Sequence, residues 1–142
     1  MNRIGGRGNT PLSMDGTGWS QKYNLLWDKV LDLRLLPDSF YEAEIASYLP
    51  RCNRYGLPLD SRADYTKSDW LVWTATLLDD QADFEKAVAP LWLAYHESES
   101  RVPLTDWYDT KTAKMVGFRH RTVQGGLFIR MLHAGGKLWR RQ

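Results

Sequence analysis

Asp60, Asp69 and Asp106 are the acidic residues whose sequence contexts suit them best to catalysis. Asp60 and Asp69 lie in YGLPLDSRADYTKSDW, residues 55–70, which gathers further acidic, basic and aromatic side chains after one Gly-x-Pro turn. Asp106 opens a second such cluster, DWYD. Two carboxyl groups flanking a glycosidic bond can hydrolyse it, and a positioned acid can transfer protons during amide hydrolysis. These three aspartates are therefore our candidate catalytic residues.

Asp69 has a structural and a functional interpretation, and both can hold at once. In Thr66-Lys67-Ser68-Asp69, Thr66 is expected to cap a helix, with Asp69 completing a capping box. In the functional interpretation, Asp69 points from the start of this helix toward a substrate. Lys67 and Trp70 beside it are then candidate substrate-binding residues.

The segment Asp60-Ser61-Arg62 is open to two interpretations as well. It can form an Asx-type turn in which Arg62 pairs with Asp60 or Asp64 at the surface, an interaction of little energetic value. Alternatively, the planar guanidinium group of Arg62 holds a carboxylate or hydroxyl group of a ligand. Arg62 is therefore a candidate substrate-binding residue.

Asp106-Trp107-Tyr108-Asp109 lies in a stretch without helical periodicity, so its rings do not follow a core pattern. Aromatic rings beside carboxylates are typical of sugar sites, where rings stack on the sugar and acids accept hydrogen bonds from hydroxyl groups. We expect Trp107, Tyr108 and Asp109 to bind substrate beside Asp106.

Helices are expected to position these residues. Apolar side chains at helical spacing predict helices over residues 19–34, 39–54, 66–78, 80–97 and 126–134. Residues 99–122 are expected to form a long loop with a short β-hairpin around Thr110–Ala113. The fold class is therefore all-α, built from α-hairpins.

Capping and breaking residues refine the helix boundaries. Ser39-x-x-Glu42 matches a capping box for the second helix, and Pro50 predicts a kink or an early end. Gly56 is expected to stop that helix in a left-handed conformation. Asp80 is expected to cap the fourth helix.

Four stretches carry a family resemblance: WSQKYNLLWDKVLDLRLLP, NRYGLPLDSRADYTKSDWLVWTA, RVPLTDWYDTKTAKMVGF and GGLFIRML. Together they resemble the C-terminal part of the glutaminase A family over about residues 17–133. The resemblance implies α-hairpins that form part of a six-hairpin, (α/α)6 toroid. We expect a flexible leader at 1–18, a partial toroid at 19–134 and a basic tail at 135–142.

The resemblance leaves three functions open. The family name implies hydrolysis of the side-chain amide of glutamine, although no Ser-His-Asp or Ser-Lys set is evident in the chain. The toroid superfamily implies hydrolysis or binding of a glycan instead. A third possibility is an incomplete, inactive toroid that associates with the remainder of the toroid or with itself through exposed apolar faces.

Composition limits the other classes of function. The net charge is +2 with interspersed signs, so no nucleic-acid partner is expected. A single Cys and three His without i, i+4 spacing predict neither a disulfide nor a metal site, and no cofactor is expected. No stretch is apolar enough for a membrane span, and the N-terminal residues do not resemble a signal peptide. The resemblance implies a secreted or periplasmic parent protein.

Overall fold

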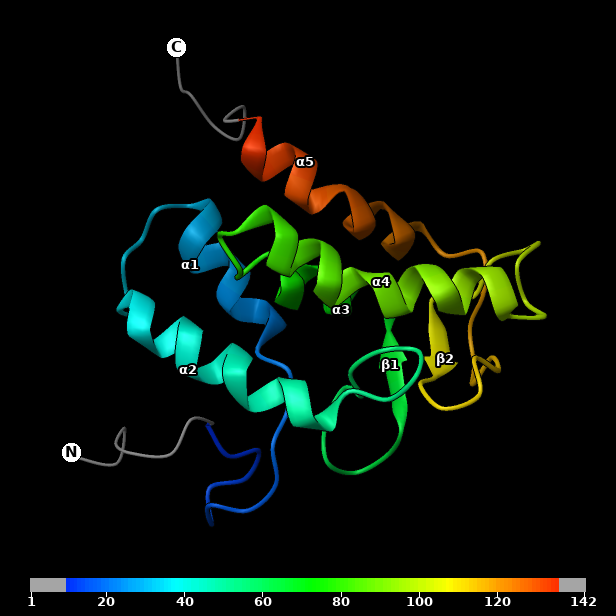
Figure 1. Cartoon of the computed structure of the whole chain (residues 1–142), viewed down its shortest axis with the longest axis horizontal. Helices are drawn as coiled ribbons and strands as arrows, with labels where there is room; N and C mark the ends of the chain where they lie inside the picture. Colours follow the sequence, from blue (N-terminus) through cyan, green and yellow to red (C-terminus); the bar gives the residue numbers. More distant parts are fainter. Residues whose placement is uncertain (1–9, 136–142) are drawn as a thin grey trace.

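A computed structural model describes residues 10–135, which are mostly helical (Figure 1). These residues form five α-helices, short 3₁₀ helices and one two-stranded antiparallel sheet. The predicted all-α class is therefore confirmed for the helices and corrected by the sheet. The predicted leader and basic tail lie partly outside the described residues, which exclude 1–9 and 136–142.

The first helix is shorter than predicted at its N-terminal end. It consists of the 3₁₀ helix η1, Tyr23–Leu25, and α1, Leu26–Val30. The preceding residues form backbone hydrogen bonds to a distant segment instead, because Gln21 N donates to Leu59 O at 2.8 Å and Ser61 N donates to Trp19 O at 2.9 Å. These bonds keep residues 19–21 extended.

The end of α1 is set by Asp28. Its carboxylate accepts hydrogen bonds from Leu35 N at 2.9 Å, Leu36 N at 3.2 Å and the hydroxyl group of Tyr41. These contacts hold the chain reversal between α1 and α2, in which Asp32 has a positive φ of 51°. The predicted continuation of the helix to residue 34 is therefore wrong.

The second helix, α2, spans Asp38–Tyr48 and is followed by the 3₁₀ helix η2, Leu49–Arg51. Its N-cap is Pro37, without a side-chain cap, so the capping box predicted at Ser39 is wrong. The predicted early end at Pro50 is confirmed. Gly56 has a φ of +125° but lies in a turn paired with Asn53, so it does not end the helix.

Two short strands join segments about forty residues apart in the sequence. β1, Tyr65–Lys67, pairs with β2, Trp107–Asp109, and Lys67 lies opposite Trp107. The short hairpin predicted around residues 110–113 is confirmed, because Asp109 N donates to Lys114 O and Val116 N donates to Trp107 O, each at 2.9 Å. The long-range pairing of β2 with β1 was not predicted.

The central helix, α3, spans Ser68–Ala75, and α4, Gln81–Glu97, packs against it. Thr66 belongs to β1 and the N-cap of α3 is Lys67 without a side-chain cap, so the capping box predicted for Thr66 and Asp69 is wrong. Asp80 caps α4 as predicted, because its side chain accepts a hydrogen bond from Asp83 N. The last helix is the 3₁₀ helix η3, Thr122–Phe128, continued by α5, Ile129–Ala134.

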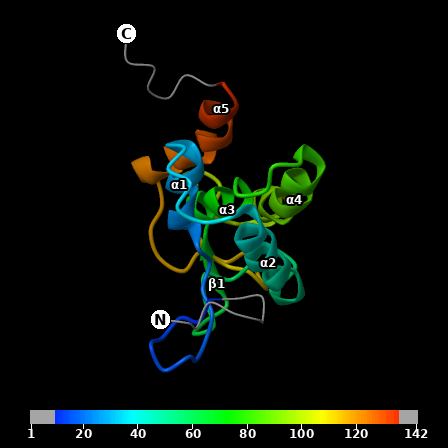
Figure 2. The same ribbon diagram turned by 90° about the vertical axis from the view of Figure 1, so that its left-hand side faces the viewer.

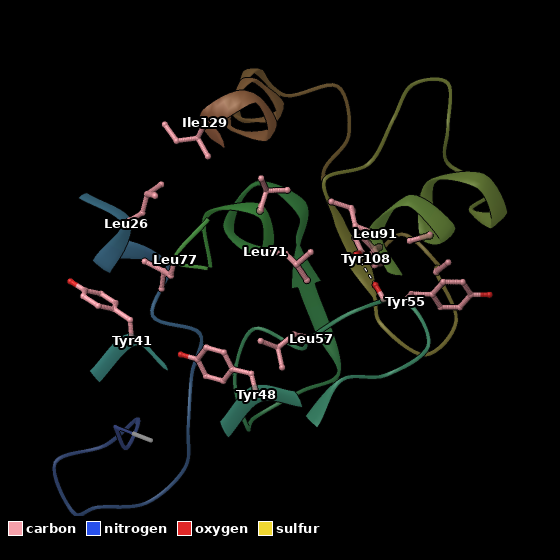
Figure 3. Packing of buried hydrophobic residues seen from close by; sticks show 13 residues of the cluster. Leu26, Tyr41, Tyr48, Tyr55, Leu57, Leu71, Leu77, Leu91, Tyr108 and Ile129 are labelled. Atoms are coloured by element: carbon pink, nitrogen blue, oxygen red, sulfur yellow. Dashed lines mark hydrogen bonds between the residues drawn. The ribbon is translucent and has the colours of Figure 1, made fainter. Parts of the chain in front are cut away.

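A single cluster of buried side chains joins these elements (Figure 3). Leucines and tyrosines from α1, α2, α3, α4 and β2 meet around Leu71, and Ile129 of α5 closes the cluster from above. Within the described residues, each helix is too short or too polar to cross a bilayer.

Gln21 ties three segments together through one buried amide group. Its Nε2 lies within hydrogen-bond distance of Leu57 O at 2.9 Å, Pro58 O at 3.0 Å and Thr66 Oγ1 at 3.1 Å. Its Oε1 accepts a hydrogen bond from Thr74 Oγ1 of α3 at 3.0 Å. Gln21 is only 2% exposed, so each partner depends on it in place of water.

We predict that Gln21→Leu lowers the free energy of unfolding by about 2–3 kcal/mol, because it leaves several buried polar groups unpaired. Urea denaturation checks this value. The matched control is Gln81→Leu, which removes an exposed amide that donates to Glu85 and should change stability by less than about 0.5 kcal/mol. Equal stability of the two variants would contradict the role assigned to Gln21.

Candidate functional site

The ribbon of β1 and β2 brings Asp69 and Asp106 to the same end. Lys67 is opposite Trp107. At the next pair of residues, Ser68 N donates to Asp106 O at 2.9 Å. Asp69 follows Ser68 in the first turn of α3. Two of the three predicted catalytic acids therefore lie at one end of the ribbon, which we call the upper end.

Asp106 is a fully buried carboxylate with a dedicated partner. Arg121 donates from Nε to Asp106 Oδ1 at 3.0 Å and from its Nη2 to Oδ2. The Arg121 guanidinium also lies 4.4 Å from the centre of the Phe118 ring. Two of its five N–H groups are directed to Asp106, and the others have no partner within residues 10–135, so they can donate to a ligand. Arg121 was missed at the sequence level because it lies in a loop without periodicity.

Asp69 is buried without such a partner. It is 5% exposed, and its Oδ1 accepts no hydrogen bond from the described residues. Burial raises the pKa of the Asp69 carboxyl above the ordinary aspartate value, and the charge of Asp106 acts in the same direction. Hydrogen bonds from the backbone N–H groups of Trp70 and Asp69, and the charge of Lys67, act in the opposite direction. Asp69 therefore holds its proton to higher pH than an ordinary aspartate does.

A glycine lets the chain close over Asp69. A Cβ atom at Gly126 of η3 would lie 3.0 Å from Asp69 Cβ and 2.9 Å from Trp73 Nε1. Trp73 Nε1 donates instead to Gly126 O at 3.1 Å. The close approach of η3 to α3 is thus a reason for the burial of Asp69.

Two further buried hydroxyl groups come from α3 and α4. Ser68 Oγ and Tyr95 OH lie near each other, and neither has another hydrogen-bond partner among the described residues. Burial raises the pKa of Tyr95 to about 12, so its hydroxyl group keeps its proton at neutral pH. Tyr95 was missed because it fits the apolar stripe of its helix, and Ser68 because it looked like part of a cap. Unpaired buried polar groups are unusual in folded proteins.

Lys67 carries a positive charge held between aromatic rings. Its Nζ lies 4.7 Å from the centre of the Trp70 ring and 4.9 Å from that of Trp107. Tyr23 stacks on Trp70 at 4.2 Å, and Phe118 stacks on Trp107 at 5.6 Å. Within residues 10–135, Lys67 forms no salt bridge, so its charge is available to an anionic ligand. The structure brings Lys67, Trp70 and Trp107 together at the upper end.

Asp60 and Arg62 lie at the other end of the ribbon, because Leu59 N donates to Tyr65 O at 2.8 Å. Asp60 accepts from Arg62 N at 2.8 Å, Nε at 3.0 Å and Nη2 at 2.6 Å. This is the Asx-type turn of the first interpretation. The hydrogen bonds from Arg62 lower the pKa of Asp60. The structure does not bring this pair together with Asp69.

Asp109 and Tyr108 are also separated from the upper end. Asp109 pairs with Tyr65, and its Oδ1 accepts from Lys111 N and Thr112 N at 2.9 Å each. Tyr108 is 1% exposed and donates its hydroxyl group to Tyr55 O at 2.9 Å within the core (Figure 3). A substrate does not reach the Tyr108 side chain in this structure. Among residues 10–135, no three His, Cys, Asp or Glu side chains are arranged as metal ligands.

We predict opposite pH dependences for two aspartate variants. The raised pKa of Asp69 means that its contribution to stability is present below the ordinary aspartate pKa, about 3.9, and is lost as pH rises through the higher folded-state value. Asp69→Asn should therefore melt above the unmodified chain at pH 7, and the difference should shrink as pH falls below about 4. Melting temperatures of Asp69→Asn and of the unmodified chain, measured from pH 7 down to below about pH 4, check this prediction.

Asp60→Asn is the matched control with the opposite sign. The lowered pKa of Asp60 stabilises the fold above the ordinary value and loses this effect as pH falls through the folded-state pKa. Asp60→Asn should thus melt below the unmodified chain at pH 7. A lower melting temperature for Asp69→Asn at pH 7 would contradict the environment described for Asp69.

We predict that Arg121→Met lowers the free energy of unfolding by about 2 kcal/mol, because it leaves the Asp106 carboxylate buried and unpaired. Adding Asp106→Asn should restore part of the loss. Lys86→Met, which removes an exposed ion pair with Asp83, should leave the melting temperature nearly unchanged. A double variant no more stable than Arg121→Met would show that the two side chains are not coupled.

Comparison with known proteins identifies the family. The family described as the glutaminase A six helical-hairpin domain matches residues 9–131. The chain is 36% identical over 115 residues to glutaminase A of Aspergillus oryzae, covering 78% of the chain and 16% of that protein. It is 35% identical over 77 residues to a probable glutaminase of Arthroderma benhamiae, covering 54% of the chain and 9% of that protein. No solved structure matches the chain.

The family match covers the upper end of the ribbon, α3 and η3, and so includes Asp69, Asp106 and Arg121. The chain spans only 16% of the length of the Aspergillus relative. The resemblance predicted from residues 17–133 is confirmed over nearly the same range. The chain belongs to the glutaminase A six-helical-hairpin domain family.

Proposed function

We propose that this chain is a segment of a glutaminase A-like hydrolase and that the upper end of its ribbon binds and hydrolyses glutamine. The buried carboxyl group of Asp69, whose Oδ1 has no hydrogen-bond partner among the described residues, is the observation that carries the proposal. Family membership supports the reaction class, since the relatives are named glutaminase A and probable glutaminase. The catalytic role of Asp69 rests on its environment.

Hydrolysis of the glutamine side-chain amide adds water to the amide carbon and breaks the carbon–nitrogen bond, releasing ammonia and glutamate. A group must take a proton from the attacking water and deliver one to the leaving nitrogen. Asp69 suits this role, because its raised pKa brings proton binding closer to neutral pH. The role is that of a proton carrier, and no covalent intermediate is required.

The cations at this end suit the charges of glutamine and of the transition state. Lys67, which has no salt-bridge partner in the described part of the chain, can pair with the substrate's α-carboxylate. Arg121, held by Asp106, can donate a remaining N–H group to the oxygen that becomes negative in the tetrahedral intermediate. Asp106 acts as the positioning residue for Arg121.

Glycan hydrolysis, the alternative, fits these contacts less well. It requires two available carboxyl groups, whereas both carboxylate oxygens of Asp106 are engaged by Arg121. The ring of Trp70 is stacked by Tyr23 and approached by Lys67, which leaves less ring surface for a sugar. Amide hydrolysis uses one free acid and is therefore the function we favour.

The proposed activity belongs to the complete domain. We propose that the α-hairpins described here form part of an (α/α)6 toroid, and that the remaining hairpins complete the substrate site. The five α-helices of the described residues are fewer than six hairpins require, so the chain alone is expected to be inactive. Asp60, Arg62 and Asp109 remain candidate residues for a ligand that extends to the other end of the ribbon.

The test uses Aspergillus oryzae glutaminase A in which the matched segment is replaced by the corresponding part of this chain. We predict that Asp69→Asn lowers ammonia release from glutamine by about 10²- to 10⁴-fold, the usual effect of removing a general acid or base. Asp83→Asn, on the exposed face of α4, should retain activity. Ammonia release is measured beside reducing-sugar release from a glycan panel, with melting curves of each variant.

Retention of ammonia release by a folded Asp69→Asn variant would refute the catalytic role of Asp69. The glycan alternative would be favoured if the unmodified chimera released reducing sugar but no ammonia, and if Asp69→Asn abolished the release of sugar. A chimera that folds but releases neither product would contradict the proposed function as a whole.

A further inference from the structure

The last helix presents its large apolar side chains away from the rest of the protein. Phe128, Met131 and Leu132 are 59%, 70% and 48% exposed. They lie at positions i, i+3 and i+4 across the junction of η3 and α5, a spacing that places them on one side of a helix. We call these three residues the α5 apolar face. Figure 2 shows α5 at the outer edge of the helical part of the molecule.

The opposite side of α5 is held mainly by polar contacts. Ile129 is its one buried residue and joins the core. Arg130 donates from Nη1 to Leu78 O at 2.8 Å and from Nη2 to Asp79 O at 3.1 Å. Its guanidinium lies 5.0 Å from the centre of the Phe84 ring. A surface helix usually directs its apolar stripe inward, whereas α5 directs Ile129 inward and leaves Met131 and Leu132 exposed.

Exposed apolar side chains also occur on α1 and directly after it. Trp27 of α1 is 39% exposed, and its ring lies edge-on to Trp73 at 5.4 Å. Trp73 in turn donates to Gly126 O in η3, two residues before Phe128. Leu31, one turn after Trp27, is 46% exposed. The α1 region therefore also carries large apolar side chains that are partly exposed.

We propose that the α5 apolar face is the docking surface for a helical hairpin from the remaining part of the six-hairpin domain. The family is described by six helical hairpins, and the described residues of this chain hold five α-helices. The chain also covers only 16% of the Aspergillus relative, so most of that protein lies outside the matched segment.

Helical geometry identifies the kind of partner. Side chains at i, i+3 and i+4 form ridges that pack into the grooves of another helix, whereas an extended peptide reads alternate residues. The three side chains of the face are uncharged and large, which calls for an apolar stripe on the partner. Docking here requires no glutaminase activity, because none of the three residues lies among the groups assigned to the proposed site.

The test measures binding to the full 142-residue chain. The probes are synthetic two-helix peptides copied from Aspergillus oryzae glutaminase A outside the matched segment, and the titrations are calorimetric. We expect at least one peptide to bind, and Met131→Asp to weaken this binding about tenfold or more. Because Met131 is exposed, the variant should keep the circular dichroism spectrum and melting temperature of the unmodified chain.

Leu49→Asp is the matched control, since Leu49 is 69% exposed and lies in η2, outside the α5 apolar face. It should bind the peptide as the unmodified chain does. Three results would overturn the proposal: no peptide binds, both variants lose binding equally, or the chain forms a dimer that Met131→Asp dissociates. The last result would identify a second copy of the chain as the occupant. Sedimentation velocity distinguishes it from peptide binding.

Discussion

The antiparallel pairing of β1 with β2 is the constraint on which the rest of the site depends. It joins two loops about forty residues apart and places Lys67 opposite Trp107. Side chains alternate between the two faces of a strand, so a shift of the pairing register by one residue would move every side chain of that strand to the opposite face. In the observed register, Thr66 and Tyr108 face the core and are buried. The next backbone bond, from Ser68 N to Asp106 O, then starts α3 beside the second acid.

The same register gives the two acids at this end different environments. Asp106 has a bidentate partner in Arg121, whereas Asp69 is buried under Gly126 without a hydrogen bond to its Oδ1. A buried carboxyl group with a raised pKa, as Asp69 has, is typical of sites that move protons. Burying a carboxyl oxygen without a partner costs stability, whereas the buried amide of Gln21 is fully hydrogen-bonded.

Much of the fold could be predicted from local sequence signals. Asp80 caps α4 and Pro50 ends α2, because capping and the lack of an amide proton act over a few residues. The long-range backbone hydrogen bonds could not be predicted in this way. Thr66 is of a residue type common at helix N-caps, but it lies in a strand that pairs with a segment far along the chain. The site shows the same limit. The sequence indicated Asp69, Lys67 and Trp107 by their neighbours, but Arg121 and Tyr95 become relevant only through tertiary contacts.

The protonation of Asp69 is the most direct test of the account, because the proposed chemistry depends on it. Carbon-13 NMR of the labelled chain can follow each aspartate carboxyl group as the pH is varied. The account predicts that Asp69 titrates above the ordinary aspartate range and that Asp60 titrates below it. An Asp69 carboxyl group that titrates at or below the ordinary value, in a chain that stays folded, would contradict the central claim.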